Sequence, residues 1–175
     1  MWIARVTGVL GFVLCVFIGL ADAQSVQTDF DRSFDFSKLK TFNFAMQRRG
    51  AGDPLAKDSL NDGRIKTALG AHLMVSGFSM ESVGKPDFAV AYYVTARDKV
   101  DVQEYRFGPF LGRRDIRVDQ YTEGTLIVDI IDPATRKLVW RGYASSAIEL
   151  KNVDEKINKA VEKLVKQFLK DTKRK

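Results

Sequence analysis

Cysteine and histidine are almost absent from this chain, and their absence excludes whole classes of chemistry. The single cysteine is Cys15, inside an apolar run near the N-terminus, and the single histidine is His72. Zinc clusters and cysteine–histidine pairs need several such residues, so we expect no metal, no thiol nucleophile and no cofactor. A serine–histidine–aspartate triad would have to use His72, whose position near the apolar side of a predicted helix indicates an ordinary, partly exposed helix residue.

Phosphate-binding loops are missing as well. Three glycines fit neither the P-loop nor the dinucleotide-binding spacing: Gly108, Gly112 and Gly124. Carboxylates are abundant, but a glycosidase also needs a carved sugar cleft, which a domain of this size rarely offers. We therefore predict that the protein is not an enzyme.

One acid has an unusual setting. Asp129 shares a predicted strand face with Ile127 and Ile131. A cross-strand pair with Arg141 explains it, because oppositely charged residues often face each other across a sheet. A functional acid is the alternative reading.

The only long apolar run lies at the N-terminus, where residues 9–20 follow a short segment with one positive charge. Ala21 and Ala23 then put small side chains at the two positions that a signal peptidase reads. The run is shorter than the roughly 20 residues that a membrane-spanning helix needs. Cys15 lacks the small neighbours of a lipidation site. We predict a signal peptide over residues 1–23, cleavage before Gln24 and a periplasmic domain over 24–175; membrane association is the alternative.

Charge is moderately basic, with 28 lysines and arginines against 22 acids and a net charge of +6. Such a balance favours anionic neighbours without naming one. For an exported protein we expect no nucleic acid partner and no membrane-spanning segment after cleavage. The expected partner is an envelope protein or an anionic envelope surface such as lipid or lipopolysaccharide.

Alternation and helical periodicity predict the elements along the chain. Strands are expected over 26–30 and 40–44, then a helix from Ser59 or Asn61 to Ser76, closed by Gly77. Further strands are expected over 88–95, 100–107, 116–120, 125–131 and 138–148, with a turn near residues 97–98. A capping box of Asn152 and Glu155 opens a second helix, whose apolar stripe is Ile157, Val161, Leu164 and Phe168.

Strands joined by short turns pair antiparallel, and both helices are amphipathic on one side only. The pattern predicts an α+β domain, a two-layer sandwich with a mainly antiparallel sheet and both helices on one face.

Two clusters of charge are candidate contact surfaces. The segment from Tyr105 to Arg117 sets arginines beside aromatic rings, an arrangement that can hold a phosphate or carboxylate of a partner: Arg106, Phe107, Phe110, Arg113, Arg114 and Arg117. A solvated hairpin is the alternative reading.

The second cluster recurs at helical spacing on the C-terminal helix, opposite its apolar stripe: Lys156, Lys159, Lys163, Lys166 and Lys170. This lysine stripe is a candidate contact with an anionic surface. Its alternative is a solubilising face.

Four blocks of sequence resemble a known family. They cover residues 35–42, 85–92, 122–129 and 138–142, reading DFSKLKTF, KPDFAVAY, TEGTLIVD and LVWRG. Together the blocks resemble the family called domain of unknown function 4136. The resemblance implies a bacterial envelope protein, often a lipoprotein, with no established activity. We expect a non-catalytic envelope domain that binds a partner; a carrier of a small apolar ligand or lipid is the alternative.

Overall fold

The computed structural model describes residues 25–46, 54–106, 114–147 and 151–172. Its strands are β1 (Ser25–Phe30), β2 (Thr41–Phe44), β3 (Ser79–Met80), β4 (Phe88–Arg106), β5 (Arg114–Asp132) and β6 (Lys137–Ala147). Its α-helices are α1 (Ser59–Val75) and α3 (Val153–Asp171), with 3-10 turns at Phe36–Lys38 and Pro54–Ala56. The predicted α+β class is confirmed. The predicted signal peptide and cleavage site lie outside the described residues.

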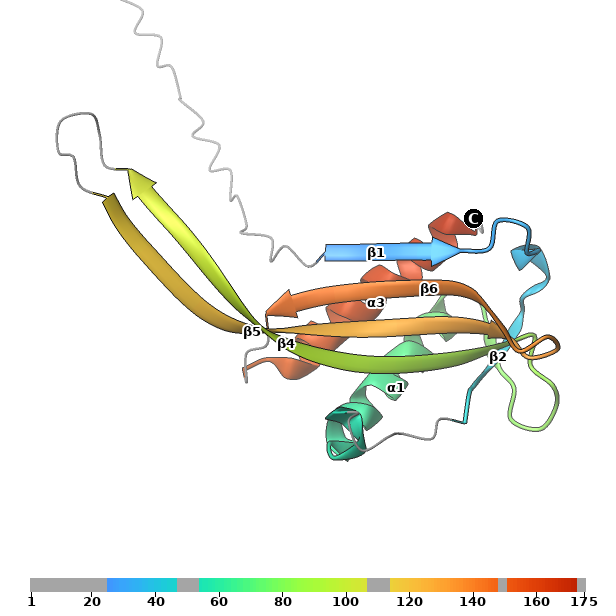
Figure 1. Ribbon diagram of the computed structural model, residues 1–175. Helices are drawn as coiled ribbons and strands as arrows, with labels where there is room; N and C mark the ends of the chain where they lie inside the picture. The colour runs from blue at the N-terminus through green and yellow to red at the C-terminus, as the bar shows by residue number, and fades with distance from the viewer. Residues whose placement is uncertain (1–24, 47–53, 107–113, 148–150, 173–175) are drawn as a thin grey trace, which may run out of the picture.

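The strands form a single mixed sheet in the order β1-β6-β5-β4-β2-β3 (Figure 1). The three ladders from β1 to β4 are antiparallel, whereas β2 runs parallel to both β4 and β3. The parallel pairs arise because the chain passes through α1 between β2 and β3 and so returns in the same direction. The short strand β3 was not predicted from the sequence.

The predicted turn at residues 97–98 is wrong, because β4 runs through it without a break. Arg97 and Asp98 face Glu123 and Thr122 of β5 in the ladder. The Thr122 hydroxyl donates to the Asp98 carboxylate over 2.8 Å, and Lys99 pairs with Glu123 over 2.7 Å. These polar residues are therefore cross-strand partners rather than turn formers. The strands predicted over 88–95 and 100–107 merge into β4, and those over 116–120 and 125–131 merge into β5.

Beyond the rest of the sheet, β4 and β5 continue as a two-stranded ribbon. The last β6 residue, Ala147, pairs with Glu123, so among the described strands residues 98–106 and 114–122 pair only with each other. We call these two segments the arm. Figure 1 shows the arm projecting away from the helices and the other strands.

The N-cap of helix α1 lies one residue before the positions that the sequence suggested. Asp58, rather than Ser59 or Asn61, is the N-cap, and its carboxylate accepts from the Asn61 backbone N–H over 3.0 Å. The predicted C-terminus is confirmed: Gly77 has φ +89°, a left-handed conformation that glycine adopts without strain. Phe78 then turns back into the core, and its N–H donates to the Leu73 carbonyl.

Helix α3 lacks the predicted capping box. Asn152 stands at the N-cap in the left-handed region, with φ 62°, and its side chain makes no capping hydrogen bond. An N-cap residue whose side chain accepts from the first turn typically has a β-region backbone, and Asn152 does not have one. Glu155 pairs instead with Lys159. The predicted apolar stripe is confirmed, since Val161, Leu164 and Phe168 are buried.

Both helices contribute to one buried cluster with the central strands. Trp140 of β6 is 1% exposed and lies at the centre of this cluster, with its ring centroid 5.2 Å from that of Phe168. Its indole N–H donates to Asp171 over 3.0 Å. A Cβ on Gly142 would collide with the Trp140 ring and lie 2.7 Å from Leu164 Cδ2, so the ring occupies space that a larger residue would fill. This aromatic end of the interface between helices and sheet is tightly filled.

Candidate ligand-binding pocket

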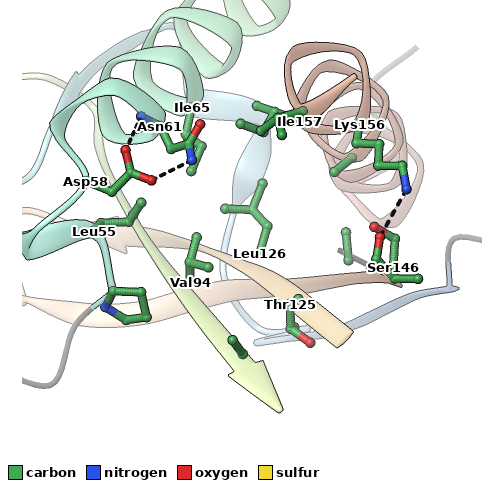
Figure 2. Close-up of a pocket in the computed structure, with 17 residues that line it drawn as sticks. Leu55, Asp58, Asn61, Ile65, Val94, Thr125, Leu126, Ser146, Lys156 and Ile157 are labelled. Atoms are coloured by element: carbon green, nitrogen blue, oxygen red, sulfur yellow. Dashed lines mark hydrogen bonds between the residues drawn. The ribbon is translucent and has the colours of Figure 1, made fainter. Parts of the chain in front are cut away.

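The opposite end of the interface between helices and sheet holds an open pocket of about 360 Å³. Figure 2 shows its side chains converging from α1, α3, β4 and β5 and from the turn before α1. Aliphatic side chains of its lining include Leu55, Ile65, Val94, Leu126 and Ile157. We call this site the apolar pocket.

The pocket exists because the sheet side of this end carries small residues. Ala96, Gly124 and Ala144 all line it. Stacked layers lie about 10 Å apart, and such short side chains cannot span that gap. At the other end of the same strands, Trp140 and Phe88 fill the corresponding space. The local choice of small against aromatic residues therefore decides which end stays open.

The pocket is also lined by a few polar groups, and these make hydrogen bonds within the protein. Asp58 accepts from both the backbone and the side-chain amide of Asn61, over 3.0 and 2.6 Å. Lys156 donates to the Ala147 carbonyl over 3.1 Å. Figure 2 shows Asp58 and Lys156 on different sides of the pocket, one beside each helix. Such an arrangement suits an apolar group held inside and a polar group directed outward.

The arginine–phenylalanine segment is only partly described. The ladder pairs Arg106 with Arg114 at the far end of the arm, and Arg117 with Gln103. The remaining members of this predicted site lie outside the described residues: Phe107, Phe110 and Arg113. The cluster stays a prediction.

The lysine stripe is interleaved with acids. Lys159 pairs with Glu155 over 2.7 Å and Lys166 with Glu162 over 2.5 Å. The hydrogen bonds from these lysines hold the pKa of each glutamate below its ordinary value. Lys156 bonds the Ala147 carbonyl, so it belongs to the pocket rather than to a free outer surface. The remaining two residues of the stripe are Lys163 and Lys170.

Asp129 is confirmed as the cross-strand partner of Arg141. The guanidinium Nε and Nη2 donate to the two carboxylate oxygens, each over 2.6 Å, and the Asp129 residue is 3% exposed. The hydrogen bonds that the Arg141 guanidinium donates to Asp129 raise its pKa above the ordinary value. The two side chains satisfy each other's hydrogen-bonding groups, so the pair explains why this acid is buried.

His72 also has a structural partner, since its Nε2 lies 3.0 Å from Asn158 Oδ1 and so joins α1 to α3. Within the described ranges, no group of three or more histidine, cysteine or acidic residues is arranged to hold a metal. In the same ranges, no helix is both long enough and apolar enough to cross a membrane.

The sequence left a carrier of a small apolar ligand as the alternative, but it did not indicate which residues form the apolar pocket. The trace of the pocket in the sequence is one small residue in each of three strands: Ala96, Gly124 and Ala144. Recognising them as a site required the register that places them together: Leu126 faces Ala144, and Ala96 faces Gly124.

Together these features define a small α+β domain whose described residues form a mixed sheet, the helices α1 and α3 and an apolar pocket at one end. The sequence profile named Domain of unknown function (DUF4136) matches residues 26–168, and the chain belongs to this family. No curated protein matches the chain.

Two solved structures are similar to this chain at low sequence identity. A PDZ domain protein from Parabacteroides distasonis is 15% identical, with a TM-score of 0.56 over 82% of this chain and 35% of its own. The present chain thus spans about a third of that protein's length. The PelC dodecamer from Paraburkholderia phytofirmans is 12% identical, with a TM-score of 0.42 over 81% of this chain and 94% of its own. The similarity to the PDZ domain protein shows a related fold and nothing about function.

Proposed function

We propose that this chain is a non-enzymatic domain of the bacterial cell envelope that binds an apolar ligand, such as a lipid acyl chain, in the apolar pocket. The observation that carries the proposal is the open volume of about 360 Å³ lined by aliphatic side chains. It favours a carrier of a small apolar ligand over an envelope protein as the occupant of this site, because the pocket is lined by both helices and by the sheet.

Size and lining agree with ligand binding. Small-molecule pockets in proteins are typically about 300 to 1,000 Å³, lined mainly by apolar side chains with a few polar groups. An apolar cavity of only about 150 Å³ is enough to bind benzene. Each methylene moved from water into such a site contributes about 0.8 kcal/mol. An acyl chain of several carbons would therefore bind measurably even after the loss of its freedom of motion.

The proposal includes a location and an architecture. The short apolar run at residues 9–20 and the small residues Ala21 and Ala23 support export and cleavage before Gln24. The shared buried cluster of α1, α3 and the central strands supports a two-layer packing with both helices on one face. Intact-mass measurement of the protein from cells tests the first part: retention of Met1, or an added acyl chain, would contradict it.

Titration with dansyl undecanoic acid tests the binding proposal. We expect saturable binding with a blue-shifted dansyl emission, as the fluorophore-bearing chain leaves water. Ala96→Phe should weaken binding at least tenfold, because Ala96 is exposed and lines the pocket, so a ring there blocks it without disturbing the core. Thr95→Phe is the matched control, since Thr95 is the exposed neighbour that lines a groove on the opposite side of the sheet.

Two results would overturn the proposal. One is the absence of saturable binding by the unmodified protein. The other is equal weakening by the two phenylalanine variants, which would place the probe on a general apolar surface rather than in the pocket.

A further inference from the structure

Three elements that line the apolar pocket change from apolar to polar in the same direction: α1 with the turn before it, β6 and α3. Followed from the closed end, where Leu69, Trp140 and Leu164 lie, each reaches an apolar lining residue first. These residues are Ile65, Ala144 and Ala160. Polar lining residues come further along the same elements: Asp58, Asn61, Ser146 and Lys156. A ligand that matches this lining has an apolar tail towards the closed end and a polar head at the other end.

Lys156 supplies the positive charge of the lining. Among the described residues that line the pocket there is one base, Lys156, and one acid, Asp58. The Lys156 Nζ donates to the carbonyl of Ala147, the last residue of β6, over 3.1 Å. A carbonyl is a neutral acceptor, so this bond holds the ammonium beside the pocket without cancelling its charge.

Asp58 is already compensated within the protein. Its Oδ1 accepts from the Asn61 backbone N–H over 3.0 Å, and its Oδ2 accepts from the Asn61 side-chain amide over 2.6 Å. It is the N-cap of α1, and the positive end of a helix dipole favours an anion there. The acid of the lining therefore serves the start of α1, and the charge left for a ligand's head is the positive one.

Ser146 stands beside Lys156. Figure 2 shows the two side chains on the same side of the pocket. Ser146 is partly buried, and its partner in the ladder is Gly124, which has no side chain to cover the hydroxyl. An ammonium and a hydroxyl group together offer two kinds of donor to a carboxylate, which accepts at both of its oxygens.

From this geometry we infer that the apolar pocket selects single-chain amphiphiles with an anionic head, of the fatty-acid type, whose carboxylate binds Lys156 and Ser146. The inference rests on the proposed function, since it requires that the pocket holds the tail. Hydrogen bonds between charged partners are roughly twice as strong as those between neutral ones, so a carboxylate gains more here than an alcohol. A cationic head is repelled by Lys156.

Competition between ligands with the same ten-carbon chain tests the inference. Each ligand displaces the neutral fluorescent probe N-phenyl-1-naphthylamine from the processed protein at about pH 7. The three ligands are decanoate, 1-decanol and decyltrimethylammonium. We expect decanoate to bind about tenfold more tightly than 1-decanol, because only decanoate gains the charge-assisted hydrogen bond. Decyltrimethylammonium should bind most weakly.

Replacement of the lysine assigns the preference to its charge. Lys156→Met should lower the affinity for decanoate about tenfold, whereas the affinity for 1-decanol should change by less than about threefold because the tail site is kept. Lys156→Arg should retain the preference. Ser146→Ala should lower the affinity for decanoate about threefold, since one neutral donor is lost.

Lys159→Met is the matched control on the same helix. Lys159 pairs with Glu155 over 2.7 Å and is not among the residues that line the pocket. Its replacement should leave the preference for decanoate within about threefold of the original, because exposed charges contribute little.

The outcomes separate this inference from the proposed function. Saturable binding of all three ligands with equal affinity would keep the apolar pocket as a binding site but overturn the anionic preference. Tighter binding of decyltrimethylammonium than of decanoate would overturn it as well, and so would equal effects of Lys156→Met and Lys159→Met. Absence of saturable binding by the probe and by every ligand would overturn the proposed function, and the inference with it.

Discussion

The two ends of the layer between helices and sheet use the same strands and helices but are packed in opposite ways. At the closed end, the rings of Trp140, Phe88 and Phe168 meet, and Gly142 makes room for the indole. At the open end, Ala96 and Ala144 leave the apolar pocket unfilled. Under the proposed function, stability and binding are separated along one interface: the aromatic end holds the fold, and the aliphatic end is left for a ligand.

The largest expected effect is at the closed end. Trp140→Ala should lower the free energy of unfolding by about 3 to 5 kcal/mol, because it removes a buried ring from a filled site. This is a large share of a total stability of about 5 to 15 kcal/mol. Urea unfolding followed by circular dichroism measures it. An unchanged transition midpoint would contradict the role given to Trp140.

A pair of identical substitutions compares the two ends directly. Leu164 packs at the closed end and Leu126 borders the apolar pocket. Leu164→Ala should lower the free energy of unfolding by about 4 kcal/mol, and Leu126→Ala by about 2 kcal/mol, the upper and lower parts of the usual range. The open end responds less because it already adjoins empty space. Equal losses in urea unfolding would mean that both ends are filled alike.

Glycine replacements give a smaller contrast of the same kind. Gly142→Ala should lower the free energy of unfolding by about 1 to 3 kcal/mol, since the new methyl group overlaps the Trp140 ring. Gly124→Ala should leave stability unchanged or slightly raised, since Gly124 lines the pocket. Thermal melting of both variants measures this, and a larger loss for Gly124→Ala would reverse the comparison.

The two α-helices differ in whether the N-cap side chain makes a hydrogen bond. Asp58→Ala should lower stability by about 1 kcal/mol, because the Asn61 N–H loses its acceptor. Asn152→Gly should change it by only a few tenths of a kcal/mol, since the Asn152 side chain caps nothing and glycine accepts its positive φ. Chemical unfolding separates them; similar losses for both variants would show that Asn152 does cap α3.

The smallest expected effect concerns pH at the closed end. Hydrogen bonds from the Thr41 and Lys40 backbone N–H groups lower the pKa of Asp87, next to the buried Phe88. A carboxylate with a lowered pKa stabilises the fold above its unfolded value of about 3.9, and this contribution is lost as pH falls below that value. Asp87→Asn should therefore flatten the decline in melting temperature between pH 5 and 3. If the Asp87→Asn variant shows the same decline, the loss of stability at low pH comes from other carboxylates.

Amphipathic periodicity predicted the helices well because a buried stripe is a local property of the sequence. The stripe of α3 and the left-handed closure of α1 at Gly77 follow from side-chain spacing and backbone sterics alone. The Asp129–Arg141 pair was also predictable, since an acid on an apolar strand face needs a nearby base.

Other features depended on pairing, which spacing does not reveal. Arg97 and Asp98 have turn-forming character, yet the opposite strand offers Glu123 and Thr122 as partners, and the ladder continues. The apolar pocket required knowledge of the register as well, because small residues from separate strands form it together. The missing cap at Asn152 depended on a backbone dihedral angle that composition does not fix.

Methyl NMR during a titration with decanoate is the most direct test of the separation between the two ends. With alanine methyl groups labelled, the account predicts saturable shifts of the Ala144 and Ala160 signals, which line the pocket, with an unshifted Trp140 indole N–H signal at the closed end. Shifts centred on Trp140, or no saturable shift at either alanine, would contradict it.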